Sequence, residues 1–325
     1  MSRSKLVSAL LPTVLPWMTS PPLRPLLNWG LRRSLRAPRL AHTRSPGDFG
    51  LAFATVRIPT ANGKTLHAWY LPAPQAAPRP SPALVIVHGW GSNADLMLPL
   101  APALHAAGLA LLFIDTRCHG ASDDEPFTSL PRFAEDTVHA VDWLAAQPDI
   151  APSRIALLGH SVGAGAVLLA ATWRPQIAAV VSLAAFAHPA DMMQRWMAEQ
   201  NLPDAVIGPY ILQYVQRTIG YRFDTIAPLT TLPQLRCPVL LMHGEHDTTV
   251  PVEDAHRLLA AAAARDSVQL HIGPGGHDSM DAFLEQMPQV IGFLNQVNSA
   301  PTDLANRIAT DSGCGCYASI SGRPQ

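Results

Sequence analysis

The sequence predicts an α/β protein, built on a mostly parallel, doubly wound sheet with helices on both faces. Short apolar runs typical of buried strands alternate along the chain with longer stretches that suit helices. Such an alternation requires crossover connections, which place parallel strands side by side in one sheet. A second observation agrees, because chemically active residue types follow directly after several of the apolar runs. Loops at the carboxyl ends of parallel strands are where such folds bind ligands.

The composition is that of a folded globular chain. Of the 325 residues, 48% are hydrophobic and 14% are charged, so the chain can bury a sizeable core. The formal net charge of −1 argues against nucleic acid as a partner of the main body. The spacing of the cysteines does not indicate a disulfide framework, and we expect reduced thiols at Cys118, Cys237, Cys314 and Cys316.

Residues 1–47 form a basic arm that differs from the rest of the chain. They contain eight basic residues and no acidic ones. An apolar run at 6–18 is broken by Pro12 and Pro16, and it is too short to span a bilayer. A signal peptide would need a small-x-small cleavage site after this run, and no convincing one follows.

Leucines in the second half of the arm recur near helical spacing, with arginines between them, at Leu23, Leu27, Leu31 and Leu35. This pattern suits an amphipathic helix that lies on an anionic membrane surface. A helix packed against the main domain, or a flexible basic extension, would have the same pattern. We therefore expect a cytoplasmic protein whose arm can make peripheral contact with a membrane, and its oligomeric state stays open.

The first half of the main domain, expected over residues 48–297, alternates strands with helices. Asn62 and Gly63 separate two strand-like runs, and Asn-Gly at such a position is a strong hairpin signal. In chain order we expect strands at 53–59, 65–71 and 83–87, a helix at 95–107, a strand at 109–114, a helix at 131–146, a strand ending at Gly159, a helix at 164–173 and a strand at 177–186.

Residues 187–225 interrupt the alternation. Methionine and aromatic residues gather there, part of them at helical spacing, which predicts a helical insertion after the sixth strand. The alternation then resumes with a strand at 238–242, a helix at 252–264, a strand at 268–272 and a helix that ends near Val297. Residues 298–325 are polar and contain glycine and serine, so we expect a flexible tail.

Ser161 lies in the pattern Gly159-His-Ser-Val-Gly163, between a predicted strand and a predicted helix. An ordinary Gly-Ser turn can have the same letters, but the flanking elements favour a sharp, strained turn that exposes the serine hydroxyl. Bulk at position 159 or 163 would collide with neighbouring backbone. The segment resembles the nucleophile elbow of the α/β-hydrolase superfamily, in its serine esterase and serine aminopeptidase-like (lysophospholipase-like) branch.

Two further loops resemble those of the same superfamily. His88-Gly-Trp-Gly91 is similar to its oxyanion loop, which implies that the amides of Trp90 and Val162 stabilise an oxyanion. An ordinary glycine-rich turn is the alternative.

The second loop is Asp115-Thr-Arg-Cys-His-Gly-Ala-Ser122, which resembles a structural loop of the superfamily with Cys118 in place of the usual glycine. The resemblance implies that Asp115, Arg117 and His119 anchor this loop. A reactive cysteine is the alternative reading, because Cys118 has basic neighbours.

The carboxylate and the base come from the last third of the chain. His243-Gly-Glu-His-Asp247-Thr-Thr-Val-Pro251 resembles the acid loop of the superfamily with Asp247 at the acid position, and Glu245 is the second candidate. His277 follows a glycine-rich loop just after the last predicted strand, which matches the position of the base. His243, His246 and Glu245 can be read as metal ligands, but no further ligand set accompanies them.

The resemblance implies an α/β-hydrolase fold with a helical lid at 187–225 and a triad in the order Ser161, Asp247, His277. It implies a serine hydrolase that forms an acyl-enzyme, and we expect carboxylic esters of small to medium acyl substrates. Amide, peptide or thioester hydrolysis and a catalytically silent binding protein are the alternatives. No cofactor or metal is implied. Side chains that either pack the lid or line the acyl pocket are Met192, Trp196, Tyr210 and Tyr214.

Overall fold

The computed structural model describes residues 24–202 and 204–299. The expectations for the apolar run at 6–18, for Leu23, for Cys314 and Cys316, and for nearly all of the tail at 298–325 lie outside these residues. The cysteines inside them, Cys118 and Cys237, are buried free thiols.

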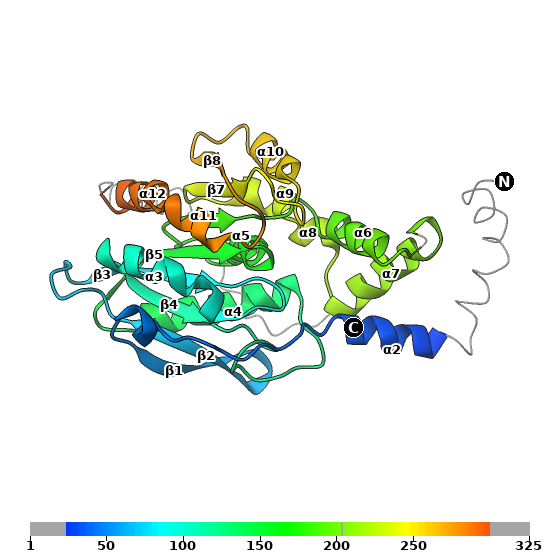
Figure 1. Ribbon diagram of the computed structural model, residues 1–325, viewed down its shortest axis with the longest axis horizontal. Helices are drawn as coiled ribbons and strands as arrows, with labels where there is room; N and C mark the ends of the chain where they lie inside the picture. The colour runs from blue at the N-terminus through cyan, green and yellow to red at the C-terminus, as the bar shows by residue number, and fades with distance from the viewer. Residues whose placement is uncertain (1–23, 203, 300–325) are drawn as a thin grey trace, which may run out of the picture.

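Eight strands form one sheet in the order β1-β2-β4-β3-β5-β6-β7-β8 (Figure 1). Strand β2 runs antiparallel to both of its neighbours, and every other pairing is parallel. The predicted mostly parallel sheet is therefore confirmed. The strands are β1 Ala54–Thr60, β2 Lys64–Leu71, β3 Ser81–Val87, β4 Ala110–Ile114, β5 Ile150–His160, β6 Val180–Leu183, β7 Val239–Gly244 and β8 Val268–Gly273.

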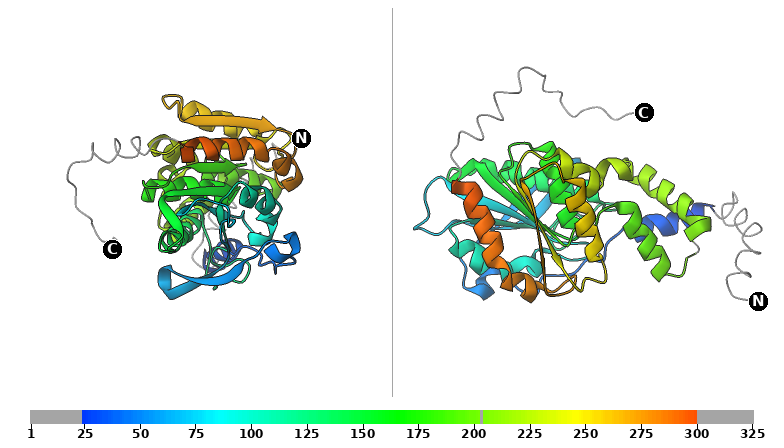
Figure 2. Two further views of the ribbon diagram at one scale, coloured as in Figure 1. Left: turned by 90° about the vertical axis from the view of Figure 1, so that its left-hand side faces the viewer. Right: turned by 90° about the horizontal axis from the view of Figure 1, so that it is seen from above.

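Helices cover both faces of the sheet (Figure 2). Because side chains alternate along a strand, Val85 and Val87 join one core while Leu84 and Ile86 of the same strand join the other. The first face carries α4 Leu130–Ala145, α5 Val162–Trp173, α9 Pro228–Thr231, η4 Leu232–Gln234 and α10 Val252–Ala261. The opposite face carries η3 Ala94–Leu100, α3 Ala101–Ala106, α11 Met280–Glu285 and α12 Met287–Ser299.

Three predicted elements differ from the structure. The helix expected at 95–107 starts as the 3₁₀ helix η3, which contains Pro99. The strand expected at 177–186 is limited to β6 and is followed by Ala184, whose φ of 55° does not fit a strand. The last helix is divided into α11 and α12 because the ring of Pro288 would clash with the preceding turn of a continuous helix.

The insertion between β6 and β7 contains α6 Pro189–Glu199, α7 Asp204–Ile219 and the short α8 Phe223–Ile226. Helices α6 and α7 extend beyond one end of the sheet, and α2 Arg24–Ser34 lies beside α7 (Figures 1 and 2). Two tyrosines of α7 hold α2: Tyr210 donates to the Asn28 side chain at 2.6 Å, and Tyr214 donates to the Asn28 carbonyl at 3.0 Å. Within the described part of the chain, no helix is both long enough and apolar enough to cross a membrane.

Residues 36–45, here called the strap, connect α2 to the main domain. Arg44 pairs with the nearly buried carboxylate of Asp95 at 2.8 Å. The His42 ring lies 2.9 Å from the buried carboxylate of Asp115. Arg39 donates to two carbonyls of the loop after β4, at 2.9 and 2.7 Å. The strap therefore crosses the loops that follow β3 and β4. After the strap come η1 Pro46–Phe49 and, within the first hairpin, η2 Ala61–Gly63.

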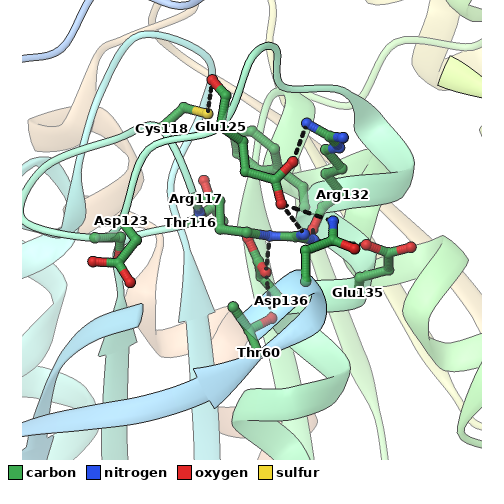
Figure 3. A network of polar contacts seen from close by, with 12 residues as sticks. Thr60, Thr116, Arg117, Cys118, Asp123, Glu125, Arg132, Glu135 and Asp136 are labelled. Atoms are coloured by element: carbon green, nitrogen blue, oxygen red, sulfur yellow. Dashed lines mark hydrogen bonds and ion pairs between the residues drawn. The ribbon is translucent and has the colours of Figure 1, made fainter. Parts of the chain in front are cut away.

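Arg117 is fully buried at the centre of a network of carboxylates (Figure 3). Its Nε donates to Asp136 at 2.7 Å, and its two terminal nitrogens donate to Glu125 at 3.0 Å and to Glu135 at 2.6 Å. Asp136 also accepts from the hydroxyl of Thr60. The network joins the loop after β4 to α4 and β1, and its acidic partners neutralise a cation that would otherwise be very unfavourable in the core.

Because Asp136 is buried beside Arg117 and Glu135 is partly exposed, we expect isosteric substitutions of these two acids to lower stability unequally. Asp136→Asn should lower the free energy of unfolding by about 3 kcal/mol or more, because it leaves a buried cation short of its counter-charge. Glu135→Gln should lower it by about 1 kcal/mol or less, because this carboxylate is 37% exposed. Urea denaturation of the two variants measures both values, and equal losses would contradict the role of burial.

Candidate active site

The register of the parallel strands brings several sequence-predicted residues to one edge of the sheet. Val87 of β3 pairs with Gly159 of β5, so the loop starting at His88 lies beside the turn that holds Ser161. Pairing then continues through β6 and β7 to β8, with Gly244 beside Gly273. The loops after β3, β5, β7 and β8 therefore leave the sheet at the same edge.

Ser161 has φ of 56° and ψ of −117°, a strained conformation for a residue with a side chain. The two glycines around it explain how this turn fits. A Cβ atom on Gly159 would lie 2.2 Å from the carbonyl oxygen of Gly163, and one on Gly163 would lie 2.4 Å from the carbonyl oxygen of His88. The expected collision at both positions is thus present. The turn lifts the hydroxyl of Ser161 out of the end of β5.

One imidazole links the serine to the predicted acid. The Nε2 atom of His277 lies 2.9 Å from Oγ of Ser161, and its Nδ1 atom lies 2.7 Å from Oδ2 of Asp247. The other oxygen of Asp247 accepts the amides of Thr249 and Val250 at 2.9 and 2.7 Å. Burial alone would raise the pKa of Asp247, but hydrogen bonds from His243, His277 and the Val250 amide hold it well below its ordinary range. The carboxylate therefore stays ionised and accepts the Nδ1 proton of His277.

His160 holds the main chain of His277, a role that we did not expect from the sequence. Its Nε2 donates to the carbonyl oxygen of His277 at 2.8 Å. Burial, together with the neighbouring His277, lowers the pKa of His160 to about 4, so its imidazole is neutral at neutral pH. The only signal in the sequence is the position of His160 between Gly159 and Ser161.

Two more neutral histidines fix the loop after β3. The Nε2 atom of His88 accepts the Thr116 amide at 3.2 Å, so its Nδ1 carries the proton and donates to the carbonyl of Gly89 at 2.7 Å. Because a trans peptide points its C=O and N–H in opposite directions, this bond fixes the orientation of the Trp90 amide. His119 accepts the next amide, that of Gly91, at 3.1 Å.

The burial of His88 and His119 lowers the pKa of both rings, that of His119 to about 3. Both therefore remain neutral hydrogen-bonding groups. Val162 is the first residue of α5, where an amide has no acceptor within its own helix. A Cβ on Gly89 would lie 3.2 Å from the Cβ of Ser161, so the loop of Trp90 lies directly beside the serine.

The geometry does not favour the alternative roles that the sequence left open for Glu245, for His243 with His246, and for Cys118. Glu245 is exposed and lies 3.6 Å from His246 rather than beside His277. The ring of His243 is buried and bonded to the carbonyl of Val250, so these three residues do not form a ligand set. Cys118 has φ of 70°, which explains the usual glycine at this position, and burial raises the pKa of its thiol, which disfavours a reactive thiolate.

Two groups of side chains within the described residues have the spacing of metal ligands. One is His160, His277 and Asp278, and its central ring is already bonded to Ser161 and Asp247. The other is His42, His67 and Asp115. The carboxylate of Asp115 already accepts the amides of Ala94 and Ala121.

The side chains expected to line the acyl pocket lie in the insertion, in three different settings. Met192 of α6 is partly buried against the core, and Trp196 of the same helix is 38% exposed. The hydroxyls of Tyr210 and Tyr214 on α7 are both bonded to Asn28 of α2. A contact of any of the four with substrate stays a prediction.

Comparison with known proteins agrees with this architecture. The family described as serine aminopeptidase S33 matches residues 78–214. The uncharacterized protein Rv2307c of Mycobacterium tuberculosis is 29% identical over 247 residues, which cover 76% of this chain and 80% of that protein.

Among solved structures, the Pyrococcus furiosus esterase Pf2001 superposes with a TM-score of 0.65 at 22% identity, over 80% of this chain and 97% of the esterase. A puromycin-hydrolyzing peptidase of Mycobacterium tuberculosis superposes with a TM-score of 0.61 at 20% identity, over 76% of this chain and 39% of the peptidase. With the sheet order and the loops at its carboxyl edge, these findings show an α/β-hydrolase fold and support a hydrolase that is similar to the serine esterase and aminopeptidase-like branch of that superfamily.

Proposed function

We propose that this protein is a serine esterase, which cleaves carboxylic esters of small to medium acyl substrates through an acyl-enzyme on Ser161. The observation that carries the proposal is the position of the His277 ring, within hydrogen-bond distance of both Ser161 and Asp247. Such a chain of hydroxyl, imidazole and carboxylate makes a serine nucleophilic at neutral pH.

In the proposed reaction, His277 removes the proton of Ser161 while the serine oxygen attacks the ester carbonyl. The amides of Trp90 and Val162 stabilise the negative charge on the carbonyl oxygen, each by about 3 kcal/mol. When the intermediate collapses, the C–O bond to the alcohol breaks and His277 gives its proton to that oxygen. Water then attacks the acyl-enzyme by the same route and releases the carboxylic acid.

Charges in the insertion favour an ester over an aminoacyl substrate. An aminopeptidase needs an acidic group to hold the substrate ammonium. Asp191 of α6 is already paired with Arg257 at 2.7 Å, so it is not free for this role, whereas Glu199 of the same helix is exposed. Met192 and Trp196 offer instead an apolar surface, and we propose that α6 and α7 act as a lid over an acyl chain.

Amide, peptide or thioester hydrolysis on the same triad is the second candidate. It is favoured by the match to the serine aminopeptidase family and by the likeness to a puromycin-hydrolyzing peptidase. A serine at position 161 disfavours dehalogenase or epoxide hydrolase chemistry, because these reactions on this fold use a carboxylate nucleophile.

Replacement of the serine should abolish turnover. We expect Ser161→Ala to lower kcat on p-nitrophenyl butyrate at least about 10³-fold, because the acyl-enzyme cannot form. A fluorophosphonate probe should label the wild type and not this variant. Ser182→Ala, on the neighbouring strand β6, is the matched control and should keep both activity and labelling. Turnover that survives in Ser161→Ala would exclude the mechanism.

The acid is tested by two carboxylates of the same loop. Asp247→Asn should lower kcat about 10⁴-fold, because the amide cannot stabilise the imidazolium and disfavours the required tautomer of His277. Glu245→Gln should leave kcat unchanged, since this carboxylate is exposed and points to His246. Steady-state kinetics with the same ester measures both. The reverse order of effects would make Glu245 the acid.

The substrate class is tested by a panel. p-Nitrophenyl esters with acyl chains of increasing length should be hydrolysed with a higher kcat/KM than aminoacyl p-nitroanilides. A thioester series with the same acyl chains completes the comparison. Faster turnover of the anilides or thioesters would replace the esterase assignment by the second candidate, while the role of Ser161 would stand.

A further inference from the structure

Helix α2 presents two large apolar side chains to solvent. Leu26 and Trp29, which are three residues apart and therefore on one face, are each 65% exposed. The leucine stripe of the arm is on the other side, since Leu31 is buried and Leu27 and Leu35 pack against the core. The three described leucines of the stripe that suggested a membrane face in the sequence thus pack inward. The apolar surface that α2 offers to a partner is the face of Leu26 and Trp29.

The exposed face is accompanied by positive charge alone. Arg32 and Arg33 lie in the last turn of α2, and both are exposed. Arg24, at the start of the helix, instead donates to the Tyr210 hydroxyl at 3.4 Å and lies over its ring. The sequence contains no carboxylate in α2 or in the residues before it. Arginine beside exposed tryptophan and leucine is complementary to a surface that has anionic groups outside and hydrocarbon beneath.

The position of α2 suits contact with a flat surface. The helix lies beside α7 at the end of the molecule where the insertion extends beyond the sheet (Figures 1 and 2). On one side of α2, Asn28 is bonded to Tyr210 and Tyr214 of α7. Leu26 and Trp29 of the same helix are exposed to solvent.

We propose that α2 is a docking helix for an anionic phospholipid surface. Leu26 and Trp29 enter the headgroup region, while Arg32 and Arg33 contact lipid phosphates. The preceding residues continue the same chemistry in sequence, because an apolar run and two further basic residues come before α2 without any acidic residue. The competing occupant is a protein partner with an acidic groove. Such a partner would bind the same face in the absence of lipid.

Docking on α2 would reach the candidate site through two routes. One is the pair of tyrosine hydroxyls that join α2 to the insertion. The other is the strap, since a Cβ on Gly91 would lie 2.9 Å from Pro38, next to the amide of Trp90. A membrane-bound α2 therefore stays in contact with α7 and, through the strap, with the loop after β3, whichever bond the enzyme cleaves.

Flotation of the full-length protein with liposomes tests the proposal. Vesicles of phosphatidylcholine with phosphatidylglycerol should bind the wild type, and pure phosphatidylcholine vesicles should bind it much more weakly. Arg32→Gln with Arg33→Gln should reduce the partition coefficient about fivefold per arginine. Leu26→Ser with Trp29→Ser should reduce it at least about tenfold. Higher salt should weaken wild-type binding.

Leu284→Ser is the matched control, because Leu284 is also an exposed leucine, 38% exposed, but belongs to α11 on the sheet. It should bind vesicles like the wild type, and all variants should keep the wild-type melting temperature. Unchanged binding of the Leu26/Trp29 variant would overturn the proposal. So would equal binding to neutral vesicles, or a wild type that does not bind vesicles at all.

Discussion

The turn from β5 into α5 leaves no space for a side chain at positions 159 and 163, and the arrangement of the site depends on this close contact. Gly159 and Gly163 allow backbone to touch backbone at distances that a Cβ would forbid. Ser161 between them is consequently held at a positive φ. The strain in this residue is balanced by the packing of α5 against the sheet, where nearly all of its side chains are buried. The hydroxyl therefore projects from a rigid support and does not depend on a mobile loop.

Around this turn, burial divides the histidines into two kinds. His88, His119 and His160 are desolvated, and their lowered pKa values keep them neutral. Each of these rings hydrogen-bonds to main-chain groups of the loops at this edge of the sheet. These bonds hold the loop after β3 and the main chain of His277 in place. His277 differs because its ring lies between a hydroxyl and a fully buried carboxylate. In the proposed mechanism this ring carries the proton, while the other three rings hold the backbone.

Helix α2 and the insertion are joined to the main domain in a different way. Arg117 and its carboxylates make the loop after β4 a rigid platform, and the strap crosses that platform through bonds to Asp115 and to loop carbonyls. Beyond the strap, α2 packs on α7 by a few leucines and by the two tyrosine hydroxyls. A conformational change in the insertion would therefore also move α2.

The sequence by itself determined the order of strands and helices, the elbow and the positions of Asp247 and His277, because local glycine chemistry and strand-end loops leave clear patterns in the residues. It did not determine the limits of β6 or the break before α12, since these depend on single positions such as Ala184 and Pro288. Only the tertiary structure decided that the leucines of α2 face inward, because helical spacing shows that a face is apolar but not whether protein or lipid covers it. The same holds for His160 and for Tyr210 and Tyr214, whose partners, His277 and Asn28, are more than a hundred residues away in the chain.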